Sequence, residues 1–176
     1  MYLWLKDPMG LLWYYSCMNY RIIVLAPSCG GKSSLMRYLR EHTDLHIAET
    51  DEEVMKANNN VWPNNDLKNK VLVPQTTNEI ISRESVIYFA SYIPDDLLIK
   101  AKQKGFKIVI LEVPLNILSE RNEKRMADEK YDDVSPWFNG QLDNFKELKS
   151  KGIANYSING NQGIEKVADD LRDYIK

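Results

Sequence analysis

Cysteine is scarce in this sequence, and neither sign of charge is in clear excess. The 176 residues include two cysteines, Cys17 and Cys29, which are too few for a disulfide framework and favour reduced thiols in a cytoplasmic setting. The 23 basic and 25 acidic side chains give a net charge of −2, so no long-range positive field exists to hold a polyanion. This balance disfavours nucleic acid as a main partner.

Long hydrophobic runs are also missing. The uncharged stretch from Pro8 to Tyr20 is shorter than the roughly 20 residues of a spanning helix, so we expect no membrane partner. A lipoprotein signal ending in LAPSC is the alternative, although Arg21 interrupts its apolar segment. Because the length suits one domain, we expect residues 18–176 to form a single domain behind an N-terminal extension, residues 1–17.

Short β-rich runs alternate with longer amphipathic segments from Arg21 onward. This alternation predicts an α/β fold, a three-layer sandwich whose five-stranded parallel sheet is covered by helices on both faces. The segment 58–74 is polar, and a short helix is expected after it at about 75–83. The strands are expected at 21–26, 45–49, 85–91, 106–113 and 155–160, and two further helices at 114–129 and 135–152.

A glycine-rich turn follows the first expected strand in the sequence IVLAPSCGGKSSL, residues 23–35. A strand that turns tightly into a helix places unpaired N–H groups and partial positive charge at the sheet edge, where anions bind. In a phosphate loop the lysine reaches the terminal phosphates and the next hydroxyl holds Mg²⁺, which here are Lys32 and Ser33. Ala26 stands at the first glycine position of the usual pattern, where a methyl group can still fit. The predicted nucleotide-binding residues are Ala26, Pro27, Ser28, Cys29, Gly30, Gly31, Lys32, Ser33 and Ser34.

The stretch APSCGGKSSL resembles the phosphate loop of the small P-loop kinases, the group that includes nucleoside monophosphate, shikimate and gluconate kinases. A second stretch, ILEVPLNILSERNEKR at 110–125, is similar in order to the segment of that group that carries an arginine pair at the base of a mobile lid. The resemblance implies a P-loop kinase-like fold with ATP and Mg²⁺ as cofactors. It also implies a helical lid at about 121–136 and an acceptor-binding excursion at about 50–83.

Two arginines of the second stretch, Arg121 and Arg125, lie four residues apart on the expected helix. Like charges at this spacing repel mildly, and a phosphate between them would reverse the sign. Both side chains are therefore predicted to clamp a transferring phosphoryl group and neutralise its charge in the transition state. The alternative is a solvated helix face on which Glu120 pairs with Lys124 and Glu129 with Arg125.

Two carboxylates, Glu49 and Asp51, end the second expected strand, at the edge where open α/β sheets bind ligands. The place resembles the Asp-x-Asp of shikimate and gluconate kinases, which implies Mg²⁺ for Glu49 and the acceptor hydroxyl for Asp51. The alternative is a capping box formed by Thr50 and Glu53. By the same resemblance, Gly160 in the turn after the last strand is expected beside adenine, although it equally fits an ordinary turn.

Arginine is scarce where such kinases build the acceptor site. Between residues 45 and 105 the only arginine is Arg83, which argues against a typical adenylate or guanylate kinase, because arginines grip phosphates in pairs of hydrogen bonds. The Asn-rich segment with Trp62, followed by Gln75, Thr76 and Thr77, suits a hydroxylated or base-like acceptor.

These features predict an ATP-dependent kinase that transfers phosphate to a nucleoside, a nucleotide or a hydroxylated metabolite. Its expected partners are a nucleoside triphosphate and this small acceptor, and the chain is expected to be a monomer or a homodimer. Two alternatives remain open. One is a P-loop NTPase or nucleotide-binding protein without a small acceptor, although the motifs of a GTPase do not follow the turn. The other is a kinase for polynucleotide ends, which the acidic balance disfavours.

Overall fold

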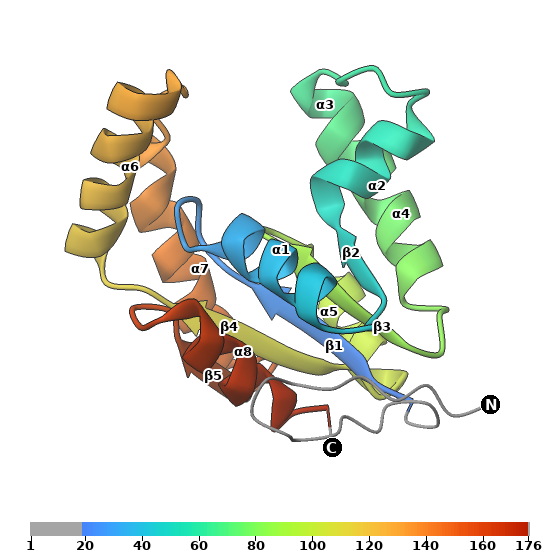
Figure 1. Ribbon diagram of the computed structural model, residues 1–176. Coiled ribbons are helices and arrows are strands. Elements are labelled where there is room, and N and C mark those ends of the chain that lie inside the picture. The colour runs from blue at the N-terminus through green and yellow to red at the C-terminus, as the bar shows by residue number, and fades with distance from the viewer. Residues whose placement is uncertain (1–18, 176) are drawn as a thin grey trace.

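Five strands lie side by side in one parallel sheet of the computed structural model, which describes residues 19–175 (Figure 1). The expected extension, residues 1–17, lies outside the described residues. The strand order is β2-β3-β1-β4-β5, and all pairs are parallel. The strands are β1 (Arg21–Leu25), β2 (Ile47–Glu49), β3 (Val86–Ala90), β4 (Lys107–Glu112) and β5 (Tyr156–Asn159). The predicted α/β fold with a five-stranded parallel sheet is confirmed.

Helices cover both faces of the sheet, because successive strand residues point to opposite sides. In β1, Ile22 and Val24 pack with α1 (Lys32–His42) and α8 (Ile164–Arg172) on one face. Ile23 and Leu25 pack into the core of the opposite face. The helices of that opposite face are α4 (Val73–Ile80), α5 (Asp95–Gln103) and α7 (Phe138–Ser150). The three predicted layers are therefore present.

The sheet changes its winding direction between β1 and β3. The connection after β1 runs through α1 toward the β2 edge, whereas the connection after β3 runs through α5 on the opposite face toward β4. Open α/β sheets bind their ligands at such a point, outside the carboxyl ends of the strands. The topology therefore directs attention to the residues that follow β1 and β3.

Two groups of helices rise beyond the carboxyl ends of the strands, on opposite sides of this point (Figure 1). One group contains α6 (Leu115–Glu129), the turn η2 (Ser135–Trp137) and the first part of α7, and it includes the segment expected to form a lid. The other group contains the segment expected to bind the acceptor, with α2 (Thr50–Ala57), α3 (Asn65–Leu67), η1 (Lys68–Leu72) and α4.

The prediction was wrong in detail for this second group. Helical structure begins at Asn65, ten residues before the predicted start at about residue 75, and α3, the π-helical η1 and α4 follow one another to Ile80. Asn64 starts this run by accepting a 2.9 Å hydrogen bond from the backbone N–H of Leu67 with its side-chain oxygen.

The strand β2 is also shorter than predicted, since the N–H of His46 donates to the hydroxyl of Tyr20 at 2.7 Å. Among residues 19–175, no helix is long and apolar enough to span a bilayer.

Candidate active site

The glycine-rich turn leaves the sheet at the change of winding direction. Ala26 is fully buried, and its N–H donates to the carbonyl of Ala90 at 3.1 Å, so it extends the pairing of β1 with β3. Its φ lies outside the left-handed region, so the backbone does not need glycine at this position. The alanine that departs from the usual phosphate-loop pattern is therefore compatible with the turn.

The two glycines of the turn serve different purposes. A Cβ on Gly30 would lie 2.7 Å from the carbonyl oxygen of Pro27, a contact that real Cβ atoms do not make. Gly31 has a φ of 94°, in the left-handed region. Cys29 also adopts a left-handed φ, 58°, which costs a non-glycine residue energy and which the sequence pattern did not indicate.

Unpaired backbone N–H groups converge at the start of α1. Gly31 occupies the N-cap position without a side-chain cap, and in the described part of the chain the N–H groups of Lys32, Ser33 and Ser34 have no acceptor. Ser28 is tied to α7, since its N–H donates to Gln141 Oε1 at 2.8 Å. The backbone of the turn is thus held in place, and its free N–H groups can donate hydrogen bonds to an anion.

Lys32 reaches back toward the end of β3. Its Nζ donates to Ser91 Oγ at 2.8 Å and lies 3.4 Å from the carbonyl oxygens of Ala26 and Pro27. Burial lowers the pKa of Lys32, because its ammonium has only neutral groups in contact, although the charges of Glu49 and Asp51 act in the opposite direction. Sequence reasoning missed Ser91, since a serine after a buried strand carries no signal of its own.

The two arginines of α6 both reach the glycine-rich turn. Arg121 donates to the carbonyl oxygens of Cys29 at 3.3 Å and Gly160 at 3.1 Å, so it joins the turn to the loop after β5. Arg125 lies 3.6 Å from Cys29 Sγ and 4.1 Å from the ring centroid of Tyr131. The structure therefore brings both side chains to one residue of the turn.

The alternative of a solvated helix face is present only in part. Arg125 lies 3.9 Å from Glu129, whereas the ion pairs of the described residues do not include one between Glu120 and Lys124. The sequence also did not predict a structural role for the buried Asn122 of the same helix. Its Nδ2 donates to Asp133 at 2.7 Å and its Oδ1 accepts from the N–H of Val134 at 3.2 Å, which fastens the segment after α6 back onto the helix.

The carboxylates after β2 have different surroundings. The alternative of a capping box formed by Thr50 and Glu53 is contradicted, because Glu49 itself caps α2 and accepts from the N–H groups of Asp51 at 2.8 Å and Glu52 at 3.1 Å. Thr50 is buried, and its hydroxyl instead donates to the hydroxyl of Tyr88 at 3.1 Å. Burial raises the pKa of Glu49, and the charge of Asp51 raises it further. Asp51 forms a 2.7 Å ion pair with Lys68.

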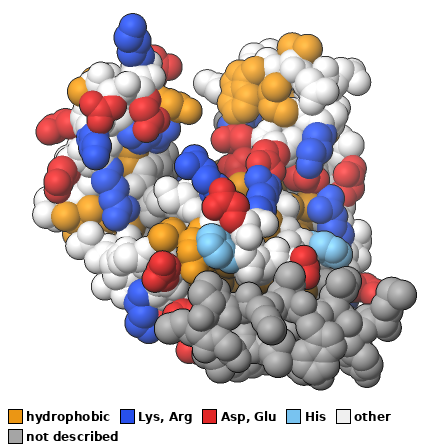
Figure 2. Space-filling model, viewed as in Figure 1, with side chains coloured by type: hydrophobic (Ala, Val, Ile, Leu, Met, Phe, Trp, Pro, Cys, Tyr) orange, Lys and Arg blue, Asp and Glu red, His pale blue; other side chains and the backbone are white. Residues whose placement is uncertain are grey.

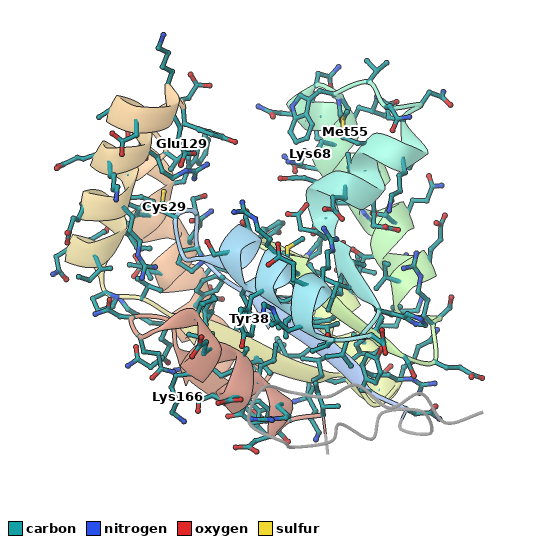
Figure 3. All side chains as sticks on the ribbon, in the orientation of Figure 1. Cys29, Tyr38, Met55, Lys68, Glu129 and Lys166 are labelled. Carbon is teal, nitrogen blue, oxygen red and sulfur yellow. The ribbon has the colours of Figure 1, made fainter. Side chains whose placement is uncertain are left out.

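These residues surround one open cavity of about 720 Å³. The space-filling view shows the hollow between the two helical groups (Figure 2), and Cys29 lies at its base with Glu129 and Lys68 on opposite walls (Figure 3). The turn, the carboxylates, Ser91 and the cations of α6 all line it. The lining includes 28–34, Arg37, Glu49, Asp51, Ser91, Arg121, Lys124, Arg125, Tyr131 and Gly160.

Gly160 occupies a tight position at the edge of this cavity. Its N–H donates to the carbonyl of Glu112 at 2.7 Å, which continues the pairing of β4 with β5. A Cβ there would lie 2.7 Å from Val113 Cγ2, so packing explains the glycine. Packing alone does not assign Gly160 to a bound base.

The donors at the metal position suit Mg²⁺ bound mainly through phosphate. Ser33 offers an exposed hydroxyl in the first turn of α1, and Glu49 keeps one oxygen free of the cap. Among residues 19–175 no cluster of three or more His, Cys, Asp or Glu side chains could hold a metal unaided. Mg²⁺ commonly takes one or two protein ligands and completes its shell with phosphate oxygens and water, so this donor set fits.

Comparison with known proteins finds similarity in structure and not in sequence. No protein-family model matches the chain, and the search of curated proteins finds no match. A gluconokinase from Sinorhizobium meliloti superposes with a TM-score of 0.63 at 16% identity, over 90% of this chain and 92% of that one. The shikimate kinase from Aquifex aeolicus gives 0.64 at 20% identity, over 86% and 93%. A sugar kinase from Janibacter gives 0.63 at 15% identity, over 89% and 94%.

All three proteins are similar to this chain over most of both lengths. The resemblance described above implies a glycine-rich turn, an acceptor excursion and a lid around one sheet edge, and residues of the segments expected to form these parts line the cavity here. Identities of 20% or less support a shared fold and nothing finer. The chain has the fold of the small P-loop kinases.

Proposed function

We propose that the chain is a kinase that transfers the terminal phosphoryl group of ATP to a small molecule. The observation that carries the proposal is the convergence at the glycine-rich turn. Free N–H groups of α1, the ammonium of Lys32 and the guanidinium groups of Arg121 and Arg125 all border one cavity. A triphosphate is the small ligand that needs so many donors and positive charges in one place.

Each predicted site residue has a role in this reaction. The backbone from Ala26 to Ser34 cradles the phosphates, and Lys32 binds the β- and γ-phosphates. Arg121 and Arg125 neutralise the charge that spreads over the transferring group. Gly160 borders the base. The Ser33 hydroxyl and the Glu49 carboxylate would hold Mg²⁺, which would supply neutralising charge at the phosphates.

Asp51 directs the acceptor in the transfer step. Its carboxylate accepts the proton of the acceptor hydroxyl while the hydroxyl oxygen bonds to the γ-phosphorus. The bond from that phosphorus to the bridging oxygen breaks in the same displacement, and ADP leaves with the bonding electron pair. Asp51 is suited to this role, because its side chain is 51% exposed and lines the cavity.

A nucleotide hydrolase without an acceptor is the second candidate, since the same turn would bind its nucleotide. Labelled ATP, offered with nucleosides, nucleotides and polyols, separates the two. We expect label in one acceptor class, loss of transfer in Lys32→Ala, and normal transfer in Lys146→Ala, a lysine that is 77% exposed and does not line the cavity. Hydrolysis that no acceptor accelerates would replace the kinase with the hydrolase.

A further inference from the structure

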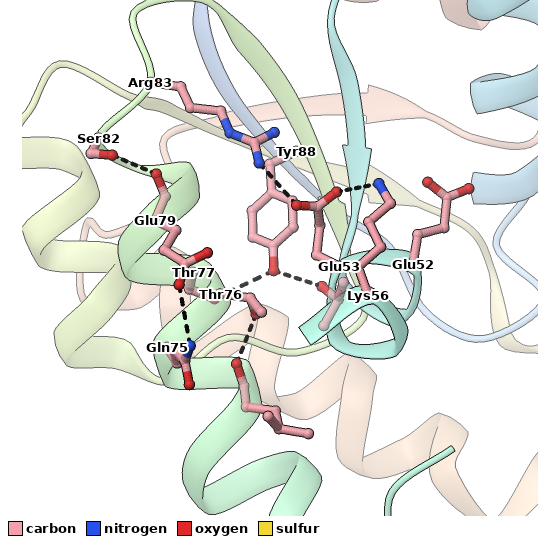
Figure 4. A network of polar contacts seen from close by, with 12 residues as sticks. Glu52, Glu53, Lys56, Gln75, Thr76, Thr77, Glu79, Ser82, Arg83 and Tyr88 are labelled. Carbon is pink, nitrogen blue, oxygen red and sulfur yellow. Dashed lines mark hydrogen bonds and ion pairs between the residues drawn. The ribbon is translucent and has the colours of Figure 1, made fainter. Parts of the chain in front are cut away.

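In the segment expected to bind the acceptor, residues 50–83, every basic side chain is already in an ion pair. Residues 50–83 contain four basic side chains, and each forms an ion pair with a carboxylate. Figure 4 shows Glu53 between two of them. The pairs are Lys56–Glu53 at 2.8 Å, Lys68–Asp51 at 2.7 Å, Lys70–Asp66 at 2.9 Å and Arg83–Glu53 at 2.9 Å.

The charge balance of this segment is slightly negative. Five acidic and four basic side chains give residues 50–83 a net charge of −1. Glu52 lines a pocket beside the cavity and has no basic partner inside the segment. Arg40 of α1 holds it instead, through two hydrogen bonds of 2.8 and 2.6 Å. A phosphate or carboxylate at this wall would have to break an ion pair and would also face Glu49 and Asp51, and like charges at short range are costly in a partly buried site.

Cations without a carboxylate partner do line the cavity, but they come from elsewhere. Among the described residues these are Lys32, Arg37, Arg121 and Lys124. Lys32 and Arg37 belong to α1, the other two belong to α6, and Arg37 also lines a neighbouring pocket with Glu49, Asp51 and Glu52. Lys32, Arg121 and Lys124 therefore lie around the expected triphosphate, and of these four cations only Arg37 also lines a pocket with both Asp51 and Glu52 of the segment 50–83.

The acceptor wall offers neutral recognition instead. Lys68 occupies Oδ1 of Asp51, which leaves Oδ2 of that carboxylate for a hydroxyl group. Lys68 is in turn held over the ring of Trp62, with its Nζ 4.4 Å from the ring centroid. Trp62 is 55% exposed, so a large part of the indole remains open to a second ring.

Resting on the proposed function, we propose that the acceptor is an uncharged alcohol that contains a ring, such as a sugar or a nucleoside. Asp51 binds the reacting hydroxyl, Lys68 holds Asp51 in place, and Trp62 packs against the ring. Acceptors that already carry a phosphate or a carboxylate are disfavoured, because residues 50–83 hold no uncommitted cation and Arg37, which lies outside this segment, shares its pocket with the carboxylates of Glu49, Asp51 and Glu52. This narrows the acceptor classes predicted from the sequence by removing nucleotides.

Matched sets of neutral and charged acceptors test whether the site prefers a neutral acceptor. The wild-type protein is assayed with saturating Mg²⁺ and ATP against an aldose, the corresponding aldonic acid and the aldose phosphate, and against a nucleoside and its 5′-monophosphate. We expect the neutral member of one set to have a kcat/KM at least tenfold above its anionic partners, and the set that responds distinguishes a sugar from a nucleoside. An anion that matches or exceeds its neutral partner overturns the inference and leaves the kinase intact. ATP binding without transfer to any acceptor overturns the proposed function itself.

Variants of the wall supply a second test. Lys68→Gln removes the partner of Asp51 and is expected to raise the KM of the neutral acceptor at least fivefold with little change in the KM of ATP. Lys70→Gln is the matched control. Lys70 lies two residues after Lys68, pairs with Asp66 and not with Asp51, and is 73% exposed. Trp62→Ala is expected to raise the acceptor KM, and Trp62→Phe to restore most of it. Equal KM values in the wild type, Lys68→Gln and Trp62→Ala would contradict the proposed wall.

Discussion

Removal of the Ser91 hydroxyl is expected to weaken nucleotide binding, because Ser91 holds the ammonium of Lys32. The ammonium has three donors, and its one short hydrogen bond goes to Ser91 Oγ at 2.8 Å. Its other contacts, to the carbonyls of Ala26 and Pro27, are 3.4 Å long and therefore weak. Phosphate oxygens can replace these two weak contacts while the bond to Ser91 remains.

The size of the effect follows from this geometry. A hydrogen bond to a charged group contributes about 1.5–3 kcal/mol, and the lower part of this range applies because Lys32 is only partly buried. Ser91→Ala is therefore expected to raise the Kd of Mg²⁺-ATP roughly tenfold, since about 1.4 kcal/mol corresponds to a factor of ten. Ser91→Asp should weaken binding further, because its carboxylate would pair with Lys32 and repel the phosphates.

Isothermal titration calorimetry with a non-hydrolysable ATP analogue and Mg²⁺ measures these constants without any acceptor. Ser91→Thr keeps the hydroxyl and serves as the control, and thermal unfolding of each variant shows whether the fold is retained. A folded Ser91→Ala protein with the wild-type Kd would refute the reasoning, and so would tighter binding in Ser91→Asp.

Three further outcomes are expected. Arg125→Ala should lower turnover about a hundredfold, within the range for loss of a transition-state charge partner, and an unchanged rate in the transfer assay would return Arg125 to the solvated face. Gly160→Ala places a Cβ 2.7 Å from Val113 Cγ2 and should cost about 1–3 kcal/mol in the free energy of unfolding, measured with urea; a stable variant would count against the packing. Glu53 is partly buried, which raises its pKa, but its two ion pairs outweigh this and hold the pKa below its ordinary value. The stabilisation is therefore present near neutral pH and lost as pH falls through the folded-state pKa, so Glu53→Gln should flatten the acid limb of stability against pH.

The segments with strong hydrophobic periodicity were predictable. The runs that form β1, β3 and β4 are short, continuous and apolar because these strands are buried on both sides, and each lies within one or two residues of its predicted range. The polar segment after Ala57 was harder to interpret, because its helices are short and one of them is π-helical. The last of them, α4, contacts β3 through the buried hydroxyls of Thr77 and Tyr88, and Tyr88 also accepts a hydrogen bond from Thr50 of α2, 38 residues earlier in the chain.

The glycine-rich turn shows the same division on a smaller scale. A strand, two glycines, a lysine and a serine in succession predicted an anion site, because the donors of such a turn are local and belong to the backbone. The sequence did not indicate that Lys32 contacts Ser91 or that Glu49, rather than Thr50 and Glu53, caps α2. The contact of Lys32 with Ser91 depends on which strands become neighbours, whereas the cap by Glu49 is local and depends on where β2 ends and α2 begins.

The layered α/β architecture, the glycine-rich turn between a strand and a helix, and the shortage of arginine at residues 45–105 follow from the sequence, because each depends on local pattern or composition. The tertiary structure alone decided that Arg121 and Arg125 meet at Cys29 and that every cation of residues 50–83 is already paired. Except for the local pairs Lys56–Glu53 and Lys70–Asp66, these contacts join segments far apart in the chain, and only the folded arrangement of strands and helices sets their distances.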